Sequence, residues 1–521
     1  MNVPGPSVTR TSWSYAAMLG LVLMGAVQTG SPYITGNDGY YHVKMAALLP
    51  ELGFVQSFPW LRWTILNENF VSHHYGFHAL LYPFVRAAQA VGAEPWLGGK
   101  MAACAAMAAA FAVFDRLIRS RGTPFPLLWA SFLAIMPWHF WLHMSYVRAP
   151  MAALPLLILS VHWCARGRVW ALFVLAYVFT QIYGGAILVP IVPGAFVLAA
   201  LITRENLRRS LWQLAASVGG IALGLVINPY FPANLSFYFT QLFETGLGAA
   251  RDVGGEWKPY ETWALLEQAA ALALVWIACL ILRLRTGVRA SRDEVGILLV
   301  HLAFFILMLK SRRFVEYWPV FALINAAEFA AVAWRARKDL GPVPVPQWLG
   351  ISGVAAVLIL GGWNLGLVWS KQKPTYDVIA LRDAMAYLRE HSPPGSLVFT
   401  DDWDIFPICF YFNHYNTYAV GLDPEFTRTR YEGLWERYRR ITRAQLPAKL
   451  SRELQTEGEA AEIRYEDIGT IFEADYVLVA FDHEKLYRAL KEKPGQFEQI
   501  YPETTDSQPE ITIFKFLRKR A

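Results

Sequence analysis

An acidic residue lies just beyond the first apolar stretch of the chain. Asp38 stands in the segment Thr35–Lys44, a few residues after the hydrophobic residues 13–30, and His42 follows it at the spacing of one helical turn. A carboxylate can orient a nucleophile and take its proton, and an imidazole can bind a metal ion or donate a hydrogen bond. The residues beside Asp38 also suit a solvated turn after a helix, so this motif alone leaves both interpretations open.

Arginines supply a second kind of chemistry. Arg148 lies in the short segment His143–Pro150, and Arg312 and Arg313 lie between two apolar stretches. A guanidinium group binds phosphate through two parallel hydrogen bonds, so we predict that these three arginines bind an anion such as a lipid phosphate. The alternative is that each long side chain extends from an apolar surface to the lipid headgroups.

The composition indicates the kind of chain that must position these residues. Of its 521 residues, 55% are hydrophobic and only 17% are charged, which is too apolar for an ordinary soluble enzyme of this length. Many stretches approach or reach the roughly 18–20 apolar residues that a bilayer core requires. The predicted spans are residues 13–30, 97–118, 124–142, 150–166, 169–183, 185–202, 211–228, 262–283, 294–309, 314–334 and 347–369.

Basic connections between these spans predict the orientation of the chain. Cytoplasmic loops carry an excess of Lys and Arg, as in the segment Arg116–Arg121. We therefore attribute the net charge of +6 to membrane topology and expect no nucleic-acid partner. An odd number of spans from a cytoplasmic N-terminus places residues 370–521 outside. Residues 77–91 are predicted to be an interfacial or re-entrant helix, because another crossing would export the Arg116–Arg121 segment.

Residues 370–521 differ from the rest of the chain. Polar helical patterns alternate there with short runs rich in Val, Ile, Phe and Tyr, which predicts a compact α/β domain. The predicted helices are residues 376–391, 425–443 and 484–491, and the predicted strands are residues 396–400, 417–421, 474–480 and 511–517.

The fold class that follows is a polytopic α-helical membrane protein with about eleven spans and an extracytoplasmic α/β domain. We predict a transmembrane domain at residues 1–369, with long outer loops at 31–96 and 229–261, and the α/β domain at residues 370–521. The four cysteines are far apart and have neither a disulfide pattern nor metal-ligand spacing.

The sequence Asn-Asp-Gly-Tyr stands at Asn37–Tyr40, in the first predicted outer loop. It resembles the first acidic motif of the catalytic subunit of oligosaccharyltransferase and, more broadly, of the GT-C glycosyltransferases, which carry that motif in their first outer loop. Tyr183–Gly185 is similar to the family's Trp-Gly-Gly, and Glu256–Pro259 to its Ser-Glu-x-x-Pro. Asp402–Asp404 stands where the family has Trp-Trp-Asp-Tyr-Gly, and Arg312–Arg313 occupies the outer end of a span, where the family places an arginine against the lipid-linked phosphate.

The chain departs from the family at two motifs. The family carries a second acidic motif, such as Ser-Tyr-Asp-Asn-Glu, where this chain has Ser-Tyr-Val-Arg-Ala at Ser145–Ala149. The metal-binding carboxylates are therefore replaced, and Arg148 puts a cation in their place. Only half of Trp-Trp-Asp-Tyr-Gly is present, so the resemblance does not extend to recognition of an Asn-x-Ser/Thr acceptor. The chain resembles a bacterial GT-C relative rather than a true oligosaccharyltransferase.

The resemblance implies a glycosyltransferase of the bacterial inner membrane with a periplasmic C-terminal domain. It would move a sugar or oligosaccharide from a polyprenyl-(pyro)phosphate carrier to an acceptor on the outer face. The implied partners are that lipid-linked donor, membrane lipids and an acceptor that the sequence does not identify. Asp38 is the predicted catalytic residue, and Arg148, Arg312 and Arg313 are the predicted phosphate ligands. The predicted substrate-binding residues are Tyr40, His73, His74, Glu256, Trp403 and Asp404.

Two arrangements would stabilise the charge of the departing phosphate. If Arg148 replaces the charge of a metal ion, no divalent ion is needed. The alternative is a Mg²⁺ or Mn²⁺ site formed by Asp38, His73, His74 and Glu256. The histidines also suit an interfacial aromatic belt, because tyrosines and phenylalanines surround them in the sequence.

Two other functions fit a chain with many spans. A transporter or flippase for a lipid-linked glycan is usually built on repeats, whereas this chain shows no internal repeat and has an appended domain. A non-catalytic membrane scaffold with an outer domain for envelope partners is consistent with the missing second acidic motif. Substitution of Asp38 separates an enzyme from a scaffold, because only the enzyme activity depends on that carboxylate.

Overall fold

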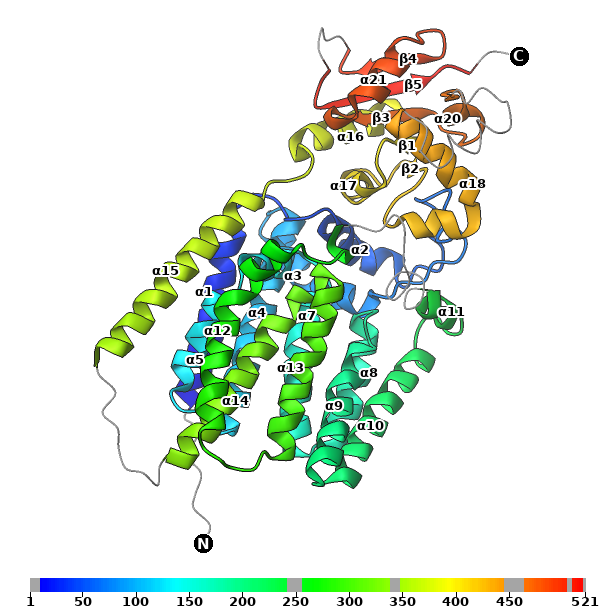
Figure 1. Ribbon diagram of the computed structural model, residues 1–521. Coiled ribbons are helices and arrows are strands. Elements are labelled where there is room, and N and C mark those ends of the chain that lie inside the picture. The colour runs from blue at the N-terminus through cyan, green and yellow to red at the C-terminus, as the bar shows by residue number, and fades with distance from the viewer. Residues whose placement is uncertain (1–9, 241–254, 338–346, 445–462, 504–507, 519–521) are drawn as a thin grey trace, which may run out of the picture. The chain divides into compact units, whose positions relative to one another are not determined.

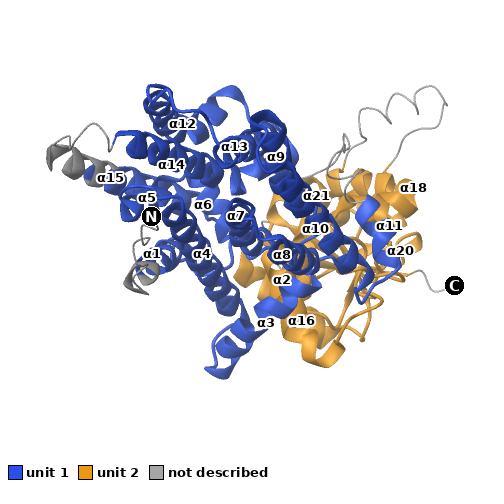
Figure 2. Ribbon diagram, turned by 90° about the horizontal axis from the view of Figure 1, so that it is seen from below, with its two compact units in different colours: residues 1–35, 73–242, 254–373 blue, residues 36–72, 243–253, 374–521 orange. Residues whose placement is uncertain are grey.

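The computed structural model describes residues 10–240, 255–337, 347–444, 463–503 and 508–518. The chain divides into two compact units (Figure 2). The first unit contains Met1–Thr35, His73–Leu242 and Gly254–Lys373, and the second contains Gly36–Ser72 and Pro374–Ala521. The division near residue 373 lies close to the predicted domain boundary. The segment 36–72, however, which belongs to the predicted first outer loop, clusters with the C-terminal region.

The first unit is helical, and its long helices run roughly side by side (Figure 1). Small residues allow close packing: a Cβ on Gly98 would lie 2.5 Å from the carbonyl oxygen of Phe84, so this glycine lets two helices approach. The elements are α1 Arg10–Gln28, α3 Tyr75–Ala90, α4 Pro95–Ser120, α5 Pro126–Phe132, η1 Leu133–Ile135, α6 Trp138–Ser145, α7 Pro150–Arg166, α8 Val169–Ile182, α9 Leu188–Thr203, α10 Leu207–Val226, α11 Ala233–Thr240, η3 Gly255–Trp257, α12 Thr262–Leu284, α13 Arg292–Lys310, η4 Arg312–Glu316, α14 Trp318–Arg337 and α15 Gln347–Lys371.

Three of the described helices are long and apolar enough to cross a bilayer, namely α4, α10 and α12. The pair α6 and α7 also passes this test, but it is bent by 115° at a short break, as in a broken span or a re-entrant loop. Shorter apolar helices lie at several other predicted spans, among them Tyr15–Gln28, Val169–Ile182 and Leu188–Thr203. The total of about eleven crossings stays a prediction.

One predicted span is wrong as a single helix. Residues 124–142 form α5, η1 and the start of α6, and the break lies at Met136 and Pro137. Met136 has an extended backbone with ψ 145°, because a proline has no N–H and clashes with a helical residue before it. The segment His143–Pro150, which carries Arg148, consequently begins inside α6 and turns sharply into α7.

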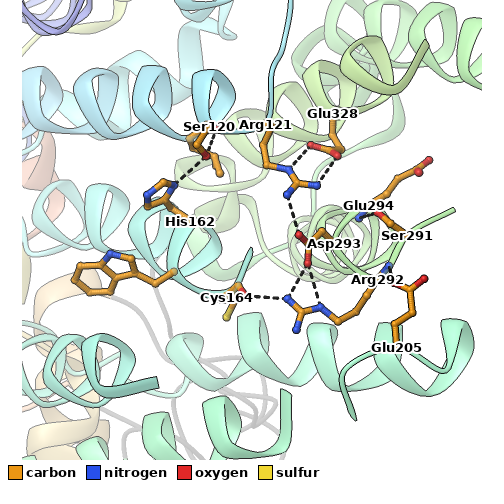
Figure 3. Close-up of polar contacts among 12 residues, drawn as sticks. Ser120, Arg121, His162, Cys164, Glu205, Ser291, Arg292, Asp293, Glu294 and Glu328 are labelled. Carbon is orange, nitrogen blue, oxygen red and sulfur yellow. Dashed lines mark hydrogen bonds and ion pairs between the residues drawn. The ribbon is translucent and has the colours of Figure 1, made fainter. Parts of the chain in front are cut away.

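Ion pairs and a hydrogen bond join four helices of the first unit (Figure 3). Arg121, at the end of α4, donates two hydrogen bonds of 2.8 Å to Glu328 of α14 and one of 2.8 Å to Asp293 of α13. Arg292 contacts the same Asp293 and donates to the carbonyl oxygen of Cys164 in α7. Only 1% of the Glu328 side chain is exposed, so this network fixes how the helices pack at this end.

The second unit contains a five-stranded mixed sheet with the order β2-β1-β3-β5-β4. β1 is parallel to β2 and to β3, whereas β5 is antiparallel to β3 and β4. The strands are β1 Leu397–Thr400, β2 Thr417–Tyr418, β3 Tyr476–Ala480, β4 Phe497–Tyr501 and β5 Ile511–Phe516, and the helices are α2 Asp38–Leu52, α16 Val378–His391, η6 Trp403–Ile405, α17 Phe406–Phe412, α18 Pro424–Arg443, α20 Asp467–Thr470, η7 Phe481–His483 and α21 Glu484–Lys491.

The four predicted strands and three predicted helices of this region are confirmed, with ends shifted by a few residues. α16 shows the local cause: the Asp377 side chain accepts hydrogen bonds from the N–H groups of Ile379 and Ala380, which caps the helix. The sequence did not predict β4. In this edge strand only Phe497 is buried, while Glu498 is exposed and the next three residues are half-buried, so it lacks the apolar pattern of its neighbours.

Candidate functional site

The first acidic motif and the Asp402–Asp404 motif meet in the second unit. The Nδ2 of Asn37 donates to Oδ2 of Asp404 over 2.8 Å and to its carbonyl oxygen over 3.2 Å. Asn37 immediately precedes α2, and Asp404 lies in η6. Two segments 367 positions apart, each chosen from the sequence for its chemistry, are therefore in direct contact.

Packing of α2 against α17 holds this contact in place. The rings of Tyr40 and Tyr411 lie 5.4 Å apart edge to face, and those of Tyr41 and Phe410 lie 6.3 Å apart. Tyr40 is buried in this contact, and its role in binding substrate stays a prediction. Asp38 is half-buried in the first turn of α2, where the helix dipole favours a negative charge. The alternative of a solvated turn does not describe this segment.

The Asp402–Asp404 motif forms a short 3₁₀ turn after β1. Asp402 caps it, since its side chain accepts a hydrogen bond of 3.1 Å from the N–H of Asp404. Trp403 packs against the apolar core of the unit. Burial raises the pKa of the Asp402 carboxyl, and the neighbouring Asp401 adds to that shift. The motif is thus anchored on one side by Trp403 and presents carboxylates on the other.

In the first unit, two of the predicted arginines converge on one carboxylate. Arg148 donates from Nη1 to both oxygens of Glu256, at 3.3 and 3.0 Å, and Arg313 donates from Nη1 to Oε1 at 3.0 Å. The side chains of Arg148 and Arg313 are 11% and 17% exposed. Burial disfavours the charge of Glu256, but Arg148 and Arg313 outweigh burial and lower its pKa to about 2. Glu256 is therefore a fixed anion between two cations.

A second carboxylate supports this group, and the sequence analysis missed it. Glu316, at the end of η4, is completely buried and lies 3.3 Å from Nη2 of Arg148. Its Oε1 also lies 3.2 Å from Nδ1 of His143. Glu316 follows Arg313 by one helical turn, and this spacing is the feature of the sequence that could have identified it. We call Arg148, Arg313, Glu256 and Glu316 the arginine–glutamate cluster; it pairs two positive with two negative side chains.

Arg312 does not join this cluster. Its Nε donates to the carbonyl oxygen of Pro259 over 3.0 Å, and its guanidinium lies 5.7 Å from the centre of the Tyr260 ring. Its backbone N–H also donates to the carbonyl oxygen of Lys258. Arg312 therefore ties the segment after Glu256 to η4, which holds Glu256 near the other two arginines.

The predicted histidines lie beside the predicted glycine motif. The rings of His74 and Tyr183 stack with their centres 5.8 Å apart, and the ring of His73 packs on Phe237 at 5.0 Å. A Cβ on Gly184 would lie 2.8 Å from Cδ2 of His73, so a glycine is required for this approach. Two motifs far apart in the sequence form one aromatic group in the first unit.

The predicted metal ligands are distributed over both units. His73, His74 and Glu256 belong to the first unit, whereas Asp38 belongs to the second. Both oxygens of Glu256 are engaged by arginine, so this carboxylate does not suit a metal ion while those contacts persist. Among the described residues, a group with metal-ligand spacing occurs elsewhere, at Asp401, Asp482 and His483 in the second unit.

Comparisons with known proteins address the fold. No family model matches the chain, and no curated protein matches it. Among solved structures, the archaeal oligosaccharyltransferase AglB from Archaeoglobus fulgidus, in complex with an inhibitory peptide and a dolichol-phosphate, superposes with a TM-score of 0.60 at 12% identity, over 97% of this chain and 74% of that one.

Two other enzymes give similar results. ArnT from Cupriavidus metallidurans, bound to undecaprenyl phosphate, has a TM-score of 0.55 at 14% identity, over 98% of this chain and 99% of that one. The arabinofuranosyltransferase AftD from Mycobacteria has a TM-score of 0.53 at 13% identity, over 99% of this chain and 40% of that one. The chain has a GT-C-like fold, with helices long and apolar enough to cross a membrane and a C-terminal α/β region.

Proposed function

We propose that this chain is a membrane glycosyltransferase that takes a sugar or oligosaccharide from a polyprenyl-phosphate carrier. The observation that carries the proposal is the convergence of Arg148 and Arg313 on the single carboxylate of Glu256. Two guanidinium groups that share one anion have the charge and geometry to hold a phosphate. The similarity of the fold to AglB bound to a dolichol-phosphate and to ArnT bound to undecaprenyl phosphate supports this assignment.

In this proposal Glu256 forms ion pairs with Arg148 and Arg313 until the donor phosphate binds and replaces it. A phosphate group offers several anionic oxygens, so it can accept the hydrogen bonds that Glu256 accepts in the resting protein. During transfer, the bond between the sugar and the carrier phosphate breaks and the phosphate keeps the electron pair. The fixed charges of Arg148 and Arg313 stabilise that developing charge without reorganisation.

Asp38 is the proposed base. Its carboxylate would orient the acceptor hydroxyl or amide and take the proton that the acceptor loses when it attacks the sugar. The contact between Asn37 and Asp404 fixes the start of α2 and therefore the direction of the Asp38 side chain. Trp403, His73 and His74 are the proposed substrate-binding groups, because aromatic and imidazole rings pack on sugars and donate hydrogen bonds to them.

The proposed location is the bacterial inner membrane, with residues 370–521 on the periplasmic face. The basic connections between the predicted spans support this orientation. The acceptor, whether protein, lipid or polysaccharide, would then be met outside the cytoplasm.

Donor binding tests the arginines directly. Undecaprenyl phosphate is titrated into the full chain in detergent, with Arg148→Gln, Arg313→Gln and the control Arg285→Gln, which changes an exposed arginine without an ion pair among the described residues. We expect the first two variants to bind more weakly, with partial recovery in Arg148→Lys. Equal affinities in all variants would refute phosphate binding at the cluster.

A glycan readout tests the transfer reaction. Cells that lack the chain receive the wild type or Asp38→Asn, and mass spectrometry compares their envelope glycans. We expect a glycan that depends on the wild type and is absent with Asp38→Asn. Envelope glycans that are the same with and without the chain would contradict the transferase assignment.

A further inference from the structure

The sheet of the second unit has a switch point between two parallel strands. In the order β2-β1-β3, the chain leaves β1 for β2 on one side, and β3 lies on the other side. The residues after the carboxyl ends of β1 and β3 are therefore neighbours, which is where ligands bind in open α/β sheets. Asp401 follows β1 directly, and Asp482 and His483 follow β3 within η7.

These three side chains bring their donor atoms together. Oδ2 of Asp401 lies 3.1 Å from Nδ1 of His483, and Oδ1 of Asp482 lies 3.1 Å from the same nitrogen. One ligand atom from each residue lies within 4.8 Å of the others. A first-row divalent ion bridges donors at this spacing.

The buried member of the group has an oxygen without a partner. Asp401 is only 1% exposed, and its Oδ2 accepts a hydrogen bond from the N–H of Ala480. Its Oδ1 is buried and has no hydrogen-bond partner among the described residues. A buried acceptor left unsatisfied is costly, so the geometry indicates a missing ligand beside Asp401.

The charge balance indicates that the ligand is a cation. Within the described ranges, no lysine or arginine forms an ion pair with Asp401, Asp402 or Asp482. His483 is the one basic side chain that contacts Asp401 and Asp482 in this part of the chain, and it lies at the centre of the group. Three carboxylates near one imidazole leave an excess of negative charge that a divalent ion would neutralise.

We propose that Asp401, Asp482 and His483 bind a divalent transition-metal ion, of which Zn²⁺ and Mn²⁺ fit one imidazole and two carboxylates. Imidazole nitrogen and carboxylate oxygen are ligands that both ions accept, and water completes the coordination. The ion would fasten η7 to the segment after β1, which continues into Asp402–Asp404. It would thereby fix Asp404, the residue that holds Asn37 at the start of α2.

The ion has a positioning role in this proposal and lies in the second unit. The proposal does not depend on the glycosyltransferase assignment, because it rests on residues of the sheet alone. It also differs from the ligand set Asp38, His73, His74 and Glu256 that the sequence suggested.

The test measures metal binding itself. The full chain in detergent is stripped with EDTA and titrated with Zn²⁺ by calorimetry, and with Mn²⁺ by electron paramagnetic resonance. The variants are Asp482→Asn and His483→Gln, which spare the hydrogen bond between Asp401 and the β3 backbone. The matched control is His391→Gln, an exposed histidine of α16 in the same unit.

We expect one ion per chain, at least a tenfold loss of affinity in Asp482→Asn and His483→Gln, and no change in His391→Gln. The Mn²⁺ spectrum should show coupling to an imidazole nitrogen that disappears in His483→Gln. Failure to bind either ion at millimolar concentration would overturn the proposal, since a protonated His483 would then be the sole counter-charge. Unchanged affinity in the folded variants would overturn it as well.

Discussion

The substitution Glu256→Gln should strengthen donor binding, although it removes two ion pairs. Glu256 has a pKa of about 2 against an ordinary value of 4.5, a depression of about 2.5. Each pKa unit corresponds to about 1.36 kcal/mol, so the charged carboxylate gains up to about 3 kcal/mol from its surroundings, chiefly Arg148 and Arg313. The side chain is 22% exposed, which makes this an upper value.

A phosphate that competes with Glu256 must replace this interaction. Gln is similar in size but neutral, so the competition largely disappears. A gain of about 3 kcal/mol corresponds to roughly a hundredfold in affinity, and we expect at least a tenfold gain. Arg148→Gln should act in the opposite direction. The two variants change the same ion pair, so opposite signs would identify Glu256 as the competitor.

The assay is calorimetric titration of undecaprenyl phosphate into the full chain, with Glu267→Gln as the control. Glu267 lies in the same unit, and its carboxylate accepts a hydrogen bond from the Trp138 indole instead of contacting the cluster. Without ligand, Glu256→Gln should unfold at a lower temperature, because two guanidinium groups lose their counter-charge. If Glu256→Gln weakens donor binding as Arg148→Gln does, Glu256 positions the arginines and does not compete, and the reasoning is refuted.

The pH dependence of this contribution has a defined sign. Because the folded pKa of Glu256 is depressed, its stabilising effect is fully present above about pH 4.5 and is lost as the pH falls toward about 2. Competition with the donor should therefore be constant from pH 6 to 8 as far as Glu256 is concerned.

Four further predictions follow from the site and the fold. Asp38→Asn should lower turnover by roughly 10²–10⁴-fold and leave donor affinity unchanged, measured by single-turnover kinetics and titration; full activity would remove Asp38 from the mechanism. EDTA should leave donor affinity unchanged, because arginines supply the charge; a loss that Mn²⁺ restores would favour the metal site predicted from the sequence, at Asp38, His73, His74 and Glu256. Arg121→Gln should destabilise the first unit by about 3–5 kcal/mol in denaturant unfolding, since buried Glu328 keeps only the half-exposed Arg335, 3.9 Å away, as a counter-charge; an effect near zero would mean that this end opens to water. A cysteine at exposed Lys493 should react with an impermeant reagent in intact spheroplasts; labelling only after lysis would invert the topology.

The sequence by itself determined the elements. The length and apolarity of the helical stretches and the alternation of strand residues reflect burial of nearby side chains, so α4, α7, α12, β1, β3 and β5 were predictable. The break at Pro137 could also be predicted from the sequence, because proline disfavours a helical backbone at the residue before it. Charged residues among apolar neighbours marked Asp38, Arg148 and Arg313 as candidates, since such placement is costly without a reason.

Only the tertiary structure decided which of these residues meet. Asn37 contacts Asp404, and Arg148 shares Glu256 with Arg313, through packing between segments that no local pattern connects. Asp401 and His483 meet because β1 and β3 are adjacent in the sheet, and strand order depends on the whole unit. Periodicity reports how each segment is buried, whereas partners are selected by the joint packing of all segments. The sequence could therefore name the reactive side chains but not their neighbours.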